Sequence, residues 1–469
     1  MITNTQIHDR VKRALSGAGS TPWLYGYDVV GIQDFIGARS RPIAMRGASE
    51  SVIAVDREHQ KLATNIFSGG GRGVGIAPSQ KDALGICEKL TTQHRNSGGV
   101  LATAMVPFQV KSERDCLTWL RYRLEVAKDE ALPPPGRPPE DKAGQCENCC
   151  RFPVEPNPTR THDEKRVCLF CDLAIRLGRK IDPQMRQSLS ELSPSKRIAA
   201  VSADGNGMGR FFDSLQSLEQ FAVASESIAG VFRVAHEAAM ARLAHPGVPL
   251  VTGGDDIRVF LAVEDVLPYV TELVRKVEET AEQTAKLLQT VLPRASVELL
   301  RTLGIGVGVV VAEDHHPAEQ LLEYAHLLED SAKVSCQVGS PGSKAPLRSA
   351  LDLEVLTSRD AFSAGQPERS GTDERPFSLD RASWESARQR ASALAQVPPS
   401  QLSTLAASRT MDEHEFRNFF RYQVARNHEW QRYLQQTNMD WRKASELDKG
   451  CPGPGLLALL RLMRTETRP

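Results

Sequence analysis

Residues 248–261 have the sequence VPLVTGGDDIRVFL, in which two β-prone apolar runs flank Gly253, Gly254, Asp255 and Asp256. Apolar runs on both sides of a short glycine-containing turn predict a β-hairpin. Its turn would present two adjacent carboxylates, which are ligands for divalent cations, and its glycines would leave room for phosphates. An ordinary surface turn fits the same tetrapeptide. The rest of the sequence must therefore decide between a metal site and a plain turn.

The composition is that of a globular protein with several domains. The chain has 469 residues, which is too long for one core, and is 41% hydrophobic and 25% charged. Its 58 Lys and Arg residues balance 58 Asp and Glu residues, which excludes a strong overall basic field for nonspecific nucleic-acid binding. With no apolar signal region at the N-terminus and no run of roughly 18 apolar residues, we expect a cytoplasmic protein without membrane spans.

An internal repeat surrounds the hairpin. A β-α-β-β-α-β order, which defines a ferredoxin-like unit, is predicted in two parts of the chain. In the first part we expect strands near 24–29 and 100–108, helices near 47–65 and 80–95, and a glycine turn at 69–71. In the second part we expect strands at 198–204 and 302–312 and helices at 221–243, 267–292 and 317–334, around the 248–261 hairpin.

The two copies can be aligned on their glycines. Placing Gly69 and Gly70 on Gly253 and Gly254 puts Gly71 and Arg72 where the second copy has Asp255 and Asp256, and placing Gly31 on Gly207 puts Asp28 on Asp204. This alignment predicts a duplication in which the first copy has lost the acidic pair. Chance similarity between two common units is the alternative. One copy would be catalytic, and the other would hold a second nucleotide at Gly69 and Gly70.

A cysteine cluster lies between the copies, after the Pro-rich segment 132–139. It contains two C-x-x-C pairs eighteen residues apart, Cys146 with Cys149 and Cys168 with Cys171. This spacing predicts a tetrahedral structural zinc site, because each pair supplies two thiolates and no position is left for water. Cys150 could replace Cys149, and His162 is a further candidate ligand.

The tail combines a strand-like run after Leu353, a flexible loop at 364–373 and helical patterns at 379–394, 399–408, 411–434 and 454–464. These patterns predict a small helical bundle. Its aromatic residues are expected to be core residues rather than nucleotide-stacking residues: Trp430, Tyr433 and Trp441.

The second copy supports nucleotidyl transfer. Asp204 ends the first strand and Asp255 with Asp256 caps the neighbouring hairpin, so the three carboxylates are expected to converge. Clustered acids repel one another without a cation, which indicates a two-metal site for Mg²⁺ or Mn²⁺. Close phosphate approach is expected at Gly205, Gly207 and Gly209. Lys333 is a candidate partner of a triphosphate, although a solvated surface lysine is the alternative.

The ordered set of motifs resembles the large palm-domain subunit of type III CRISPR effector complexes. The resemblance extends from about Trp23 to the last helices and rests on segments GIQDFI (31–36), RGAS (46–49), the C-x-x-C pairs, DGNGMG (204–209), GGDD (253–256) and RPFSL (375–379). It implies an α+β protein with two ferredoxin-like palm domains flanking a zinc-binding module and a C-terminal helical domain. The corresponding domains are 1–22 (extension), 23–128 (degenerate palm), 129–196 (linker and zinc module), 197–350 (catalytic palm) and 351–469 (linker and helical domain).

The resemblance also implies an activity. The family makes cyclic oligoadenylates from ATP, with metal-binding acids that correspond to Asp204, Asp255 and Asp256 and a lysine that corresponds to Lys333. It implies crRNA, target RNA and other effector subunits as candidate partners.

One departure from the family is expected. Only about twenty residues precede the first predicted palm, and the His-Asp dipeptides lack the further ligands of an HD nuclease. We therefore expect no DNase domain, and a stand-alone cyclase remains open beside a crRNA-guided subunit. A catalytically silent scaffold or RNA-binding subunit is the alternative function, and a diguanylate cyclase fits less well because it lacks the duplicated palm and the zinc site.

Overall fold

The computed structural model describes residues 4–109, 112–131, 144–154, 160–162, 165–181, 189–336, 349–356, 375–408, 413–443, 446 and 450–466. The Pro-rich segment 132–139 and the predicted loop 364–373 lie outside the described residues. No helix in the described part of the chain is long and apolar enough to cross a membrane.

The first sheet has four strands in the order β2-β3-β1-β4. All three of its strand pairs are antiparallel, and the chain order is β-α-β-β-α-β, as predicted for the first copy. The elements are α1 (Asn4–Ser16), β1 (Trp23–Val29), α2 (Ile32–Gly37), α3 (Pro42–Gln60), β2 (Asn65–Gly69), β3 (Arg72–Ala77), α4 (Gln80–Arg95), β4 (Leu101–Pro107) and α5 (Glu113–Glu130).

The second sheet has six strands in the order β12-β11-β10-β7-β9-β8. Four of these strands, in the order β10-β7-β9-β8, correspond to β4-β1-β3-β2 of the first sheet. The elements are β7 (Arg197–Gly205), α7 (Met208–Asp213), α8 (Leu218–Met240), β8 (Val248–Gly253), β9 (Asp256–Ala262), α9 (Val266–Leu288), α10 (Arg294–Arg301), β10 (Ile305–Glu313), α11 (Ala318–Cys336), β11 (Ala350–Val355) and β12 (Phe377–Ser378).

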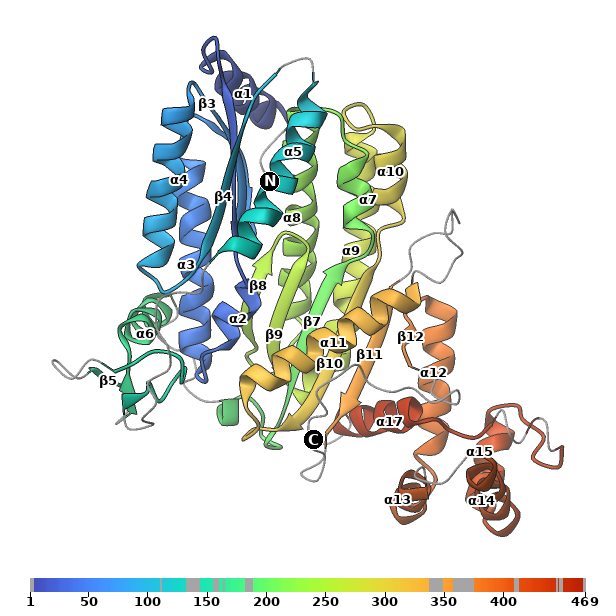
Figure 1. The fold of residues 1–469 in the computed structure, drawn as a ribbon. Coiled ribbons are helices and arrows are strands. Elements are labelled where there is room, and N and C mark those ends of the chain that lie inside the picture. The colour runs from blue at the N-terminus through green and yellow to red at the C-terminus, as the bar shows by residue number, and fades with distance from the viewer. Residues whose placement is uncertain are drawn as a thin grey trace.

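Alternation along β7 divides the second sheet into two faces. Ala199, Val201 and Ala203 join the apolar cluster of α8 and α9, whereas Ile198 and Ala200 join the cluster of α11. Ser202 and Asp204 continue the α11 face toward the end of the strand. Figure 1 shows α11 lying across β10 and β7. The strand pattern therefore places the polar end of β7 beneath the last turns of α11.

The two sheets are joined by shared helical packing. Helix α5 covers one face of the first sheet and packs on α8, and α1 also packs on α8. A Cβ atom on Gly26 of β1 would lie 3.1 Å from both Leu120 and Leu124 of α5, so the helix sits directly on the strand. One continuous apolar cluster consequently includes residues from both units.

The cysteine module packs on α3. It contains β5 (Arg160–His162), β6 (Lys165–Val167) and α6 (Leu169–Ile181), followed by the short 3-10 helix η3 (Leu189–Glu191). Helices α6 and α3 cross at two glycines, because a Cβ on Gly47 would lie 1.8 Å from the carbonyl oxygen of Ala174 and one on Gly178 would lie 2.2 Å from that of Ile43. This backbone contact fixes the module against the first sheet.

The C-terminal helices are α12 (Arg381–Leu394), α13 (Pro399–Ala407), α14 (Glu413–Arg426), α15 (His428–Gln436) and α17 (Pro454–Glu466). Trp430 and Tyr433 are fully buried, which confirms their prediction as core residues, and Trp441 packs against the same core.

Several predicted boundaries differ from the structure. Helix α3 begins at Pro42, which occupies a first-turn position, and ends at Gln60 rather than near 65. The single helix predicted at 411–434 is wrong, because Asn427 has an extended backbone and separates α14 from α15. Strands β11 and β12, from the segment assigned to the C-terminal domain, extend the second sheet.

Candidate functional site

The three predicted carboxylates lie at one end of the second sheet. Asp204 is paired with Gly306 of β10, and Asp256 begins β9, one residue before the pair formed by Ile257 and Ala203. Asp255 occupies the turn between β8 and β9. Burial, and then the negative charge of Asp204, raise the pKa of Asp255 well above its ordinary value. These two acids therefore share a site that favours a proton or a cation between them.

Lys333 faces this site from α11. Its ammonium group forms ion pairs with Asp204 and, at 2.9 Å, with Glu329. Although burial opposes the charge, the two carboxylates raise the pKa of Lys333 above its ordinary value. The solvated-surface alternative for Lys333 is therefore wrong, since its side chain is only 19% exposed and is held between two acids.

Glu329 holds the ammonium group of Lys333 in position. Its carboxylate is 1% exposed and accepts a hydrogen bond of 2.6 Å from Ser202 of β7. Burial would raise the pKa of Glu329, but the hydrogen bond from His326 and the charge of Lys333 outweigh it and lower the pKa to about 2. Glu329 therefore stays ionised and keeps Lys333 in place.

Asp256 faces a different partner. Its Oδ1 atom lies 3.7 Å from Nε of Arg258, whose side chain is 4% exposed. Burial raises the pKa of Asp256 to about 6, and Arg258 opposes this shift. The Oδ1 atom of Asp256 is buried and accepts no hydrogen bond in the described part of the chain.

The carboxylates are thus close but do not form one compact cluster. Among the described residues, two groups bring three or more ligand atoms within 4.8 Å of one another: the four cysteines, and His326 with Glu329 and Asp330. Asp204 and Asp255 come together, while Asp256 is turned toward Arg258. Oxygen ligands are those that Mg²⁺ and Mn²⁺ prefer, and Asp256 Oδ1 has no hydrogen bond in the described part of the chain, so the donor set fits a divalent cation that would compete with Lys333 and Arg258 for these carboxylates.

The turn of the first sheet touches this site. Gly70 and Gly71 form a turn with φ values of 67° and 78°, which favour glycine, and Gly254 of the second turn has φ 64°. A Cβ on Gly253 would lie 2.8 Å from the Cα atom of Gly70. The hairpins at Gly69–Gly70 and Gly253–Gly254, which the sequence aligned with each other, therefore meet backbone to backbone.

The glycines after Asp204 have separate roles. Gly207 adopts φ 74° at the start of α7, as Gly31 does with φ 56° at the start of α2. Gly209 has open space around it, whereas a Cβ on Gly205 would lie 3.2 Å from the side chain of Asp255. Close approach of a phosphate remains a prediction for all three glycines, and Gly205 also leaves room for the side chain of Asp255.

The four predicted zinc ligands converge. Cys146, Cys149, Cys168 and Cys171 are all buried, and the Sγ atoms of Cys149 and Cys168 lie 3.9 Å apart. Zinc–sulfur bonds of about 2.3 Å in a tetrahedron place sulfurs about 3.8 Å apart. The backbone N–H of Cys168 also donates to the sulfur of Cys146 at 3.2 Å. The four thiols therefore fit a structural zinc ion.

The two alternative zinc ligands lie elsewhere. Cys150 is exposed, and Nε2 of His162 donates a 2.7 Å hydrogen bond to the buried carboxylate of Asp172. His162 is therefore a partner of Asp172 on α6, in line with its absence from the compact cysteine group.

Several residues of these sites were not predicted from the sequence. Arg39 is 4% exposed and lies near the cysteines. Burial lowers the pKa of its guanidinium group, and the charges of the cysteines oppose this shift. Ser202, Arg258 and Glu329 complete the network under α11. The spacing of Ser202 from Asp204 and of Arg258 from Asp256 was a usable signal, because residues two apart share a strand face.

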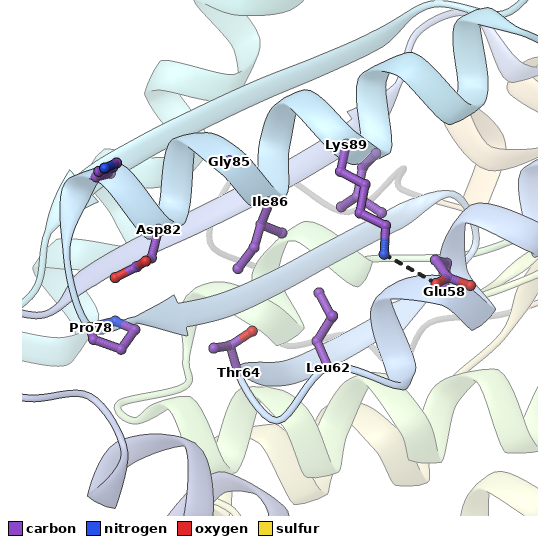
Figure 2. Close-up of a pocket in the computed structure, with 10 residues that line it drawn as sticks. Glu58, Leu62, Thr64, Pro78, Asp82, Gly85, Ile86 and Lys89 are labelled. Carbon is purple, nitrogen blue, oxygen red and sulfur yellow. Dashed lines mark hydrogen bonds and ion pairs between the residues drawn. The ribbon is translucent and has the colours of Figure 1, made fainter.

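A separate pocket lies at the other end of the first hairpin. Its volume is about 490 Å³, and its lining includes Thr64, just before β2, and Pro78, just after β3. Figure 2 shows Lys89 paired with Glu58 at its edge. Because the Gly70–Gly71 turn joins the opposite ends of these strands, the pocket is distinct from the carboxylate site.

Comparison with known proteins identifies the second unit. Residues 197–337 match the family described as the second palm domain of Cas10/Cmr2. This match confirms the resemblance of the chain to the large subunit of type III CRISPR complexes. No curated protein sequence matches the chain.

Solved structures share the fold over nearly the whole chain. Csm1 of T. onnurineus has a TM-score of 0.58 at 17% identity, covering 99% of this chain and 74% of that one. A Csm1-Csm4 cassette in complex with cA4 gives 0.58 at 16% identity, with 99% and 74% coverage. The cassette in complex with AMPPNP gives 0.55 at 16% identity, with 99% and 72% coverage. At these identities, the comparison establishes the fold.

Proposed function

We propose that this protein is a palm-domain nucleotidyltransferase that converts ATP to cyclic oligoadenylate second messengers in type III CRISPR or related antiviral defence. The observation that carries the proposal is the group formed by Asp204, Asp255 and Lys333 where the hairpins of the two sheets meet. Structures of the Csm1-Csm4 cassette in complex with AMPPNP and with cA4 support a nucleotide substrate and a cyclic product. The first sheet would then be the degenerate palm, and its turn at Gly69 and Gly70 would face the second nucleotide.

The side chains have distinct roles in this proposal. Asp204, Asp255 and Asp256 would hold Mg²⁺ or Mn²⁺, which would supply charge neutralisation for the attack of a ribose hydroxyl on an α-phosphate. Lys333 would offset phosphate charge, while Glu329 and Ser202 keep its ammonium group near the site. The turn glycines leave the phosphates room.

The same comparison supports a proposal for the partners of this chain. The solved relatives include Csm1 bound to Csm4 within a type III-A CRISPR-Csm interference complex. We propose that this protein likewise works with effector subunits and with crRNA and target RNA, while the zinc module acts as a structural element.

The test is direct. Purified protein is incubated with each nucleoside triphosphate and Mg²⁺ or Mn²⁺, with and without RNA, and products are identified by mass spectrometry. We expect cyclic oligoadenylates from the native protein and none from the Asp255→Asn, Asp256→Asn double variant, with fold and zinc content unchanged. Asp213→Asn, at a 68% exposed side chain, is the matched control and retains activity.

Two outcomes would overturn the proposal. Retained synthesis in the double variant would remove these acids from catalysis. Absence of product from the native protein under every condition would favour the scaffold or RNA-binding alternative, and copurifying small RNA would then identify a crRNA-guided complex.

A further inference from the structure

A buried carboxylate controls the turn of the first sheet. Oδ2 of Asp56, on α3, accepts a 3.0 Å hydrogen bond from the backbone N–H of Gly71. Asp56 is 5% exposed. Loss of this buried acceptor would leave the N–H of Gly71 without its hydrogen-bond partner. The turn therefore takes its position from α3 as well as from its own strands.

A second layer holds Asp56 itself. The hydroxyl of Tyr27 on β1 donates a 2.8 Å hydrogen bond to Oδ1 of Asp56, and Ser68 of β2 donates one of 3.0 Å to the Asp56 carbonyl. The hydroxyl oxygens of Tyr27 and Ser68 also lie 2.7 Å apart, and both residues are buried. Interlocked buried polar groups of this kind restrict side-chain motion. None of these residues takes part in the chemistry proposed for the carboxylate site.

The Gly70–Gly71 turn lies in direct contact with the Gly253–Gly254 turn of the second sheet. Gly70, next to Gly71, is close enough that a Cβ on it would lie 3.3 Å from the carbonyl carbon of Gly253 and from the nitrogen of Gly254. Neither turn has a side chain at this contact. Because the two backbones touch directly, a displacement of one turn must move the other. Asp255 follows Gly254 immediately.

We propose that Asp56 is a positioning residue: by fixing the Gly70–Gly71 turn, it fixes the Gly253–Gly254 turn that presents Asp255. The catalytic meaning of this placement rests on the proposed function, whereas the placement itself does not. The first hairpin, which has lost its acidic pair, would thus limit the movement of the second hairpin. The glycines of the first hairpin permit the backbone contact, and Asp56 restricts the motion of its turn.

Hydrogen exchange of the full chain tests the placement. In Asp56→Ala we expect amide exchange to rise about tenfold or more at residues 69–72 and also at 252–256, since the buried acceptor of the Gly71 N–H is lost. The matched control is Asp265→Ala, which removes another buried carboxylate that accepts backbone N–H groups of Ala244 and His245. The control should raise exchange near 244–245 and leave 69–72 and 252–256 unchanged.

The conservative variant separates positioning from general damage. Asp56→Asn retains an oxygen for the Gly71 N–H and should restore protection at 252–256 to within about twofold of the native protein. Exchange that rises at 69–72 but stays native at 252–256 in Asp56→Ala would overturn the proposal. An equal rise at 252–256 in the Asp265→Ala control would do the same, since it would show general loosening.

Synthesis assays add a second readout. In Asp56→Ala we expect kcat to fall about tenfold with little change in KM for ATP, and Asp56→Asn should recover most of the loss. If the native protein makes no product, the proposed function fails while the exchange result still decides the placement. If the native protein is active and Asp56→Ala leaves exchange at 252–256 unchanged, the positioning role of Asp56 is wrong while the proposed function stands.

Discussion

Lys333 of α11 reaches Asp204 of β7 by passing over Gly306 of β10. A Cβ atom at Gly306 would lie 2.6 Å from Cγ of Lys333, so the lysine stem fills the space that any other residue would need. Gly306 also pairs directly with Asp204 across the sheet. The glycine is therefore required for a lysine to cross the sheet and meet the carboxylate.

Replacement of this glycine should impair the site. In Gly306→Ala the new methyl group displaces the Lys333 stem, and we expect at least about a tenfold loss of nucleotidyltransferase activity, equivalent to about 1.4 kcal/mol. Gly85→Ala, at an α4 position with open space around it, is the control and should leave activity unchanged. Native activity in Gly306→Ala would show that the Lys333–Asp204 pair is dispensable.

Removal of the lysine charge should destabilise the fold. Lys333→Met leaves Asp204 and the buried Glu329 without their cation, so we expect the free energy of unfolding to fall by roughly 1.5–3 kcal/mol. Urea denaturation followed by circular dichroism measures the change. Lys61→Met, which removes a 70% exposed lysine, should change stability by less than about 0.5 kcal/mol. An equal loss in both variants would argue against a special role for the buried pair.

Neighbouring cysteines should respond differently to substitution. Cys149→Ala removes a buried thiol from the four-sulfur group, so purified protein should lose its zinc by elemental analysis. Cys150→Ala removes an exposed thiol next to it and should keep one zinc per chain. Zinc loss in Cys150→Ala with retention in Cys149→Ala would reverse the ligand assignment.

The pH dependence of stability should carry the signature of Asp56. Burial raises the pKa of Asp56 from 3.8 to about 7. The folded protein then binds this proton more tightly than the unfolded chain, so the contribution of Asp56 to stability declines as pH rises from about 4 to about 7 and is constant above. The slope for one group is at most about 1.4 kcal/mol per pH unit.

Substitution isolates this contribution. Asp56→Asn does not titrate, so the native protein should lose stability relative to the variant across that pH window, measured by urea denaturation at several pH values. Parallel curves for the two proteins would show that Asp56 keeps an ordinary pKa in the folded state.

The sequence predicted the repeated order of elements because local signals define it. Gly31 and Gly207 occupy matching left-handed positions at helix starts, and the glycine turns end matching hairpins. The four-cysteine group was also predictable, since its spacing is set by the local geometry of each pair.

Other features depend on contacts between distant segments and had no local signal. Glu329 is one helical turn from Lys333, yet its bond to Ser202 arises only when α11 lies on β7. Helix α5 was not predicted either. Its close packing on the first sheet depends on Gly26 of β1, which is distant from α5 in the sequence.

The crossing of α3 and α6 limits how this protein can be recombined. Gly47 and Gly178 let the two backbones touch, and α6 starts directly after Cys168 while α3 carries Asp56 toward the turn. A cysteine module exchanged for that of another chain would meet the wrong surface on α3 unless that helix came with it. The unit that can be transplanted is therefore the helix pair with its four-cysteine group, rather than the cysteine segment that the linear sequence delimits.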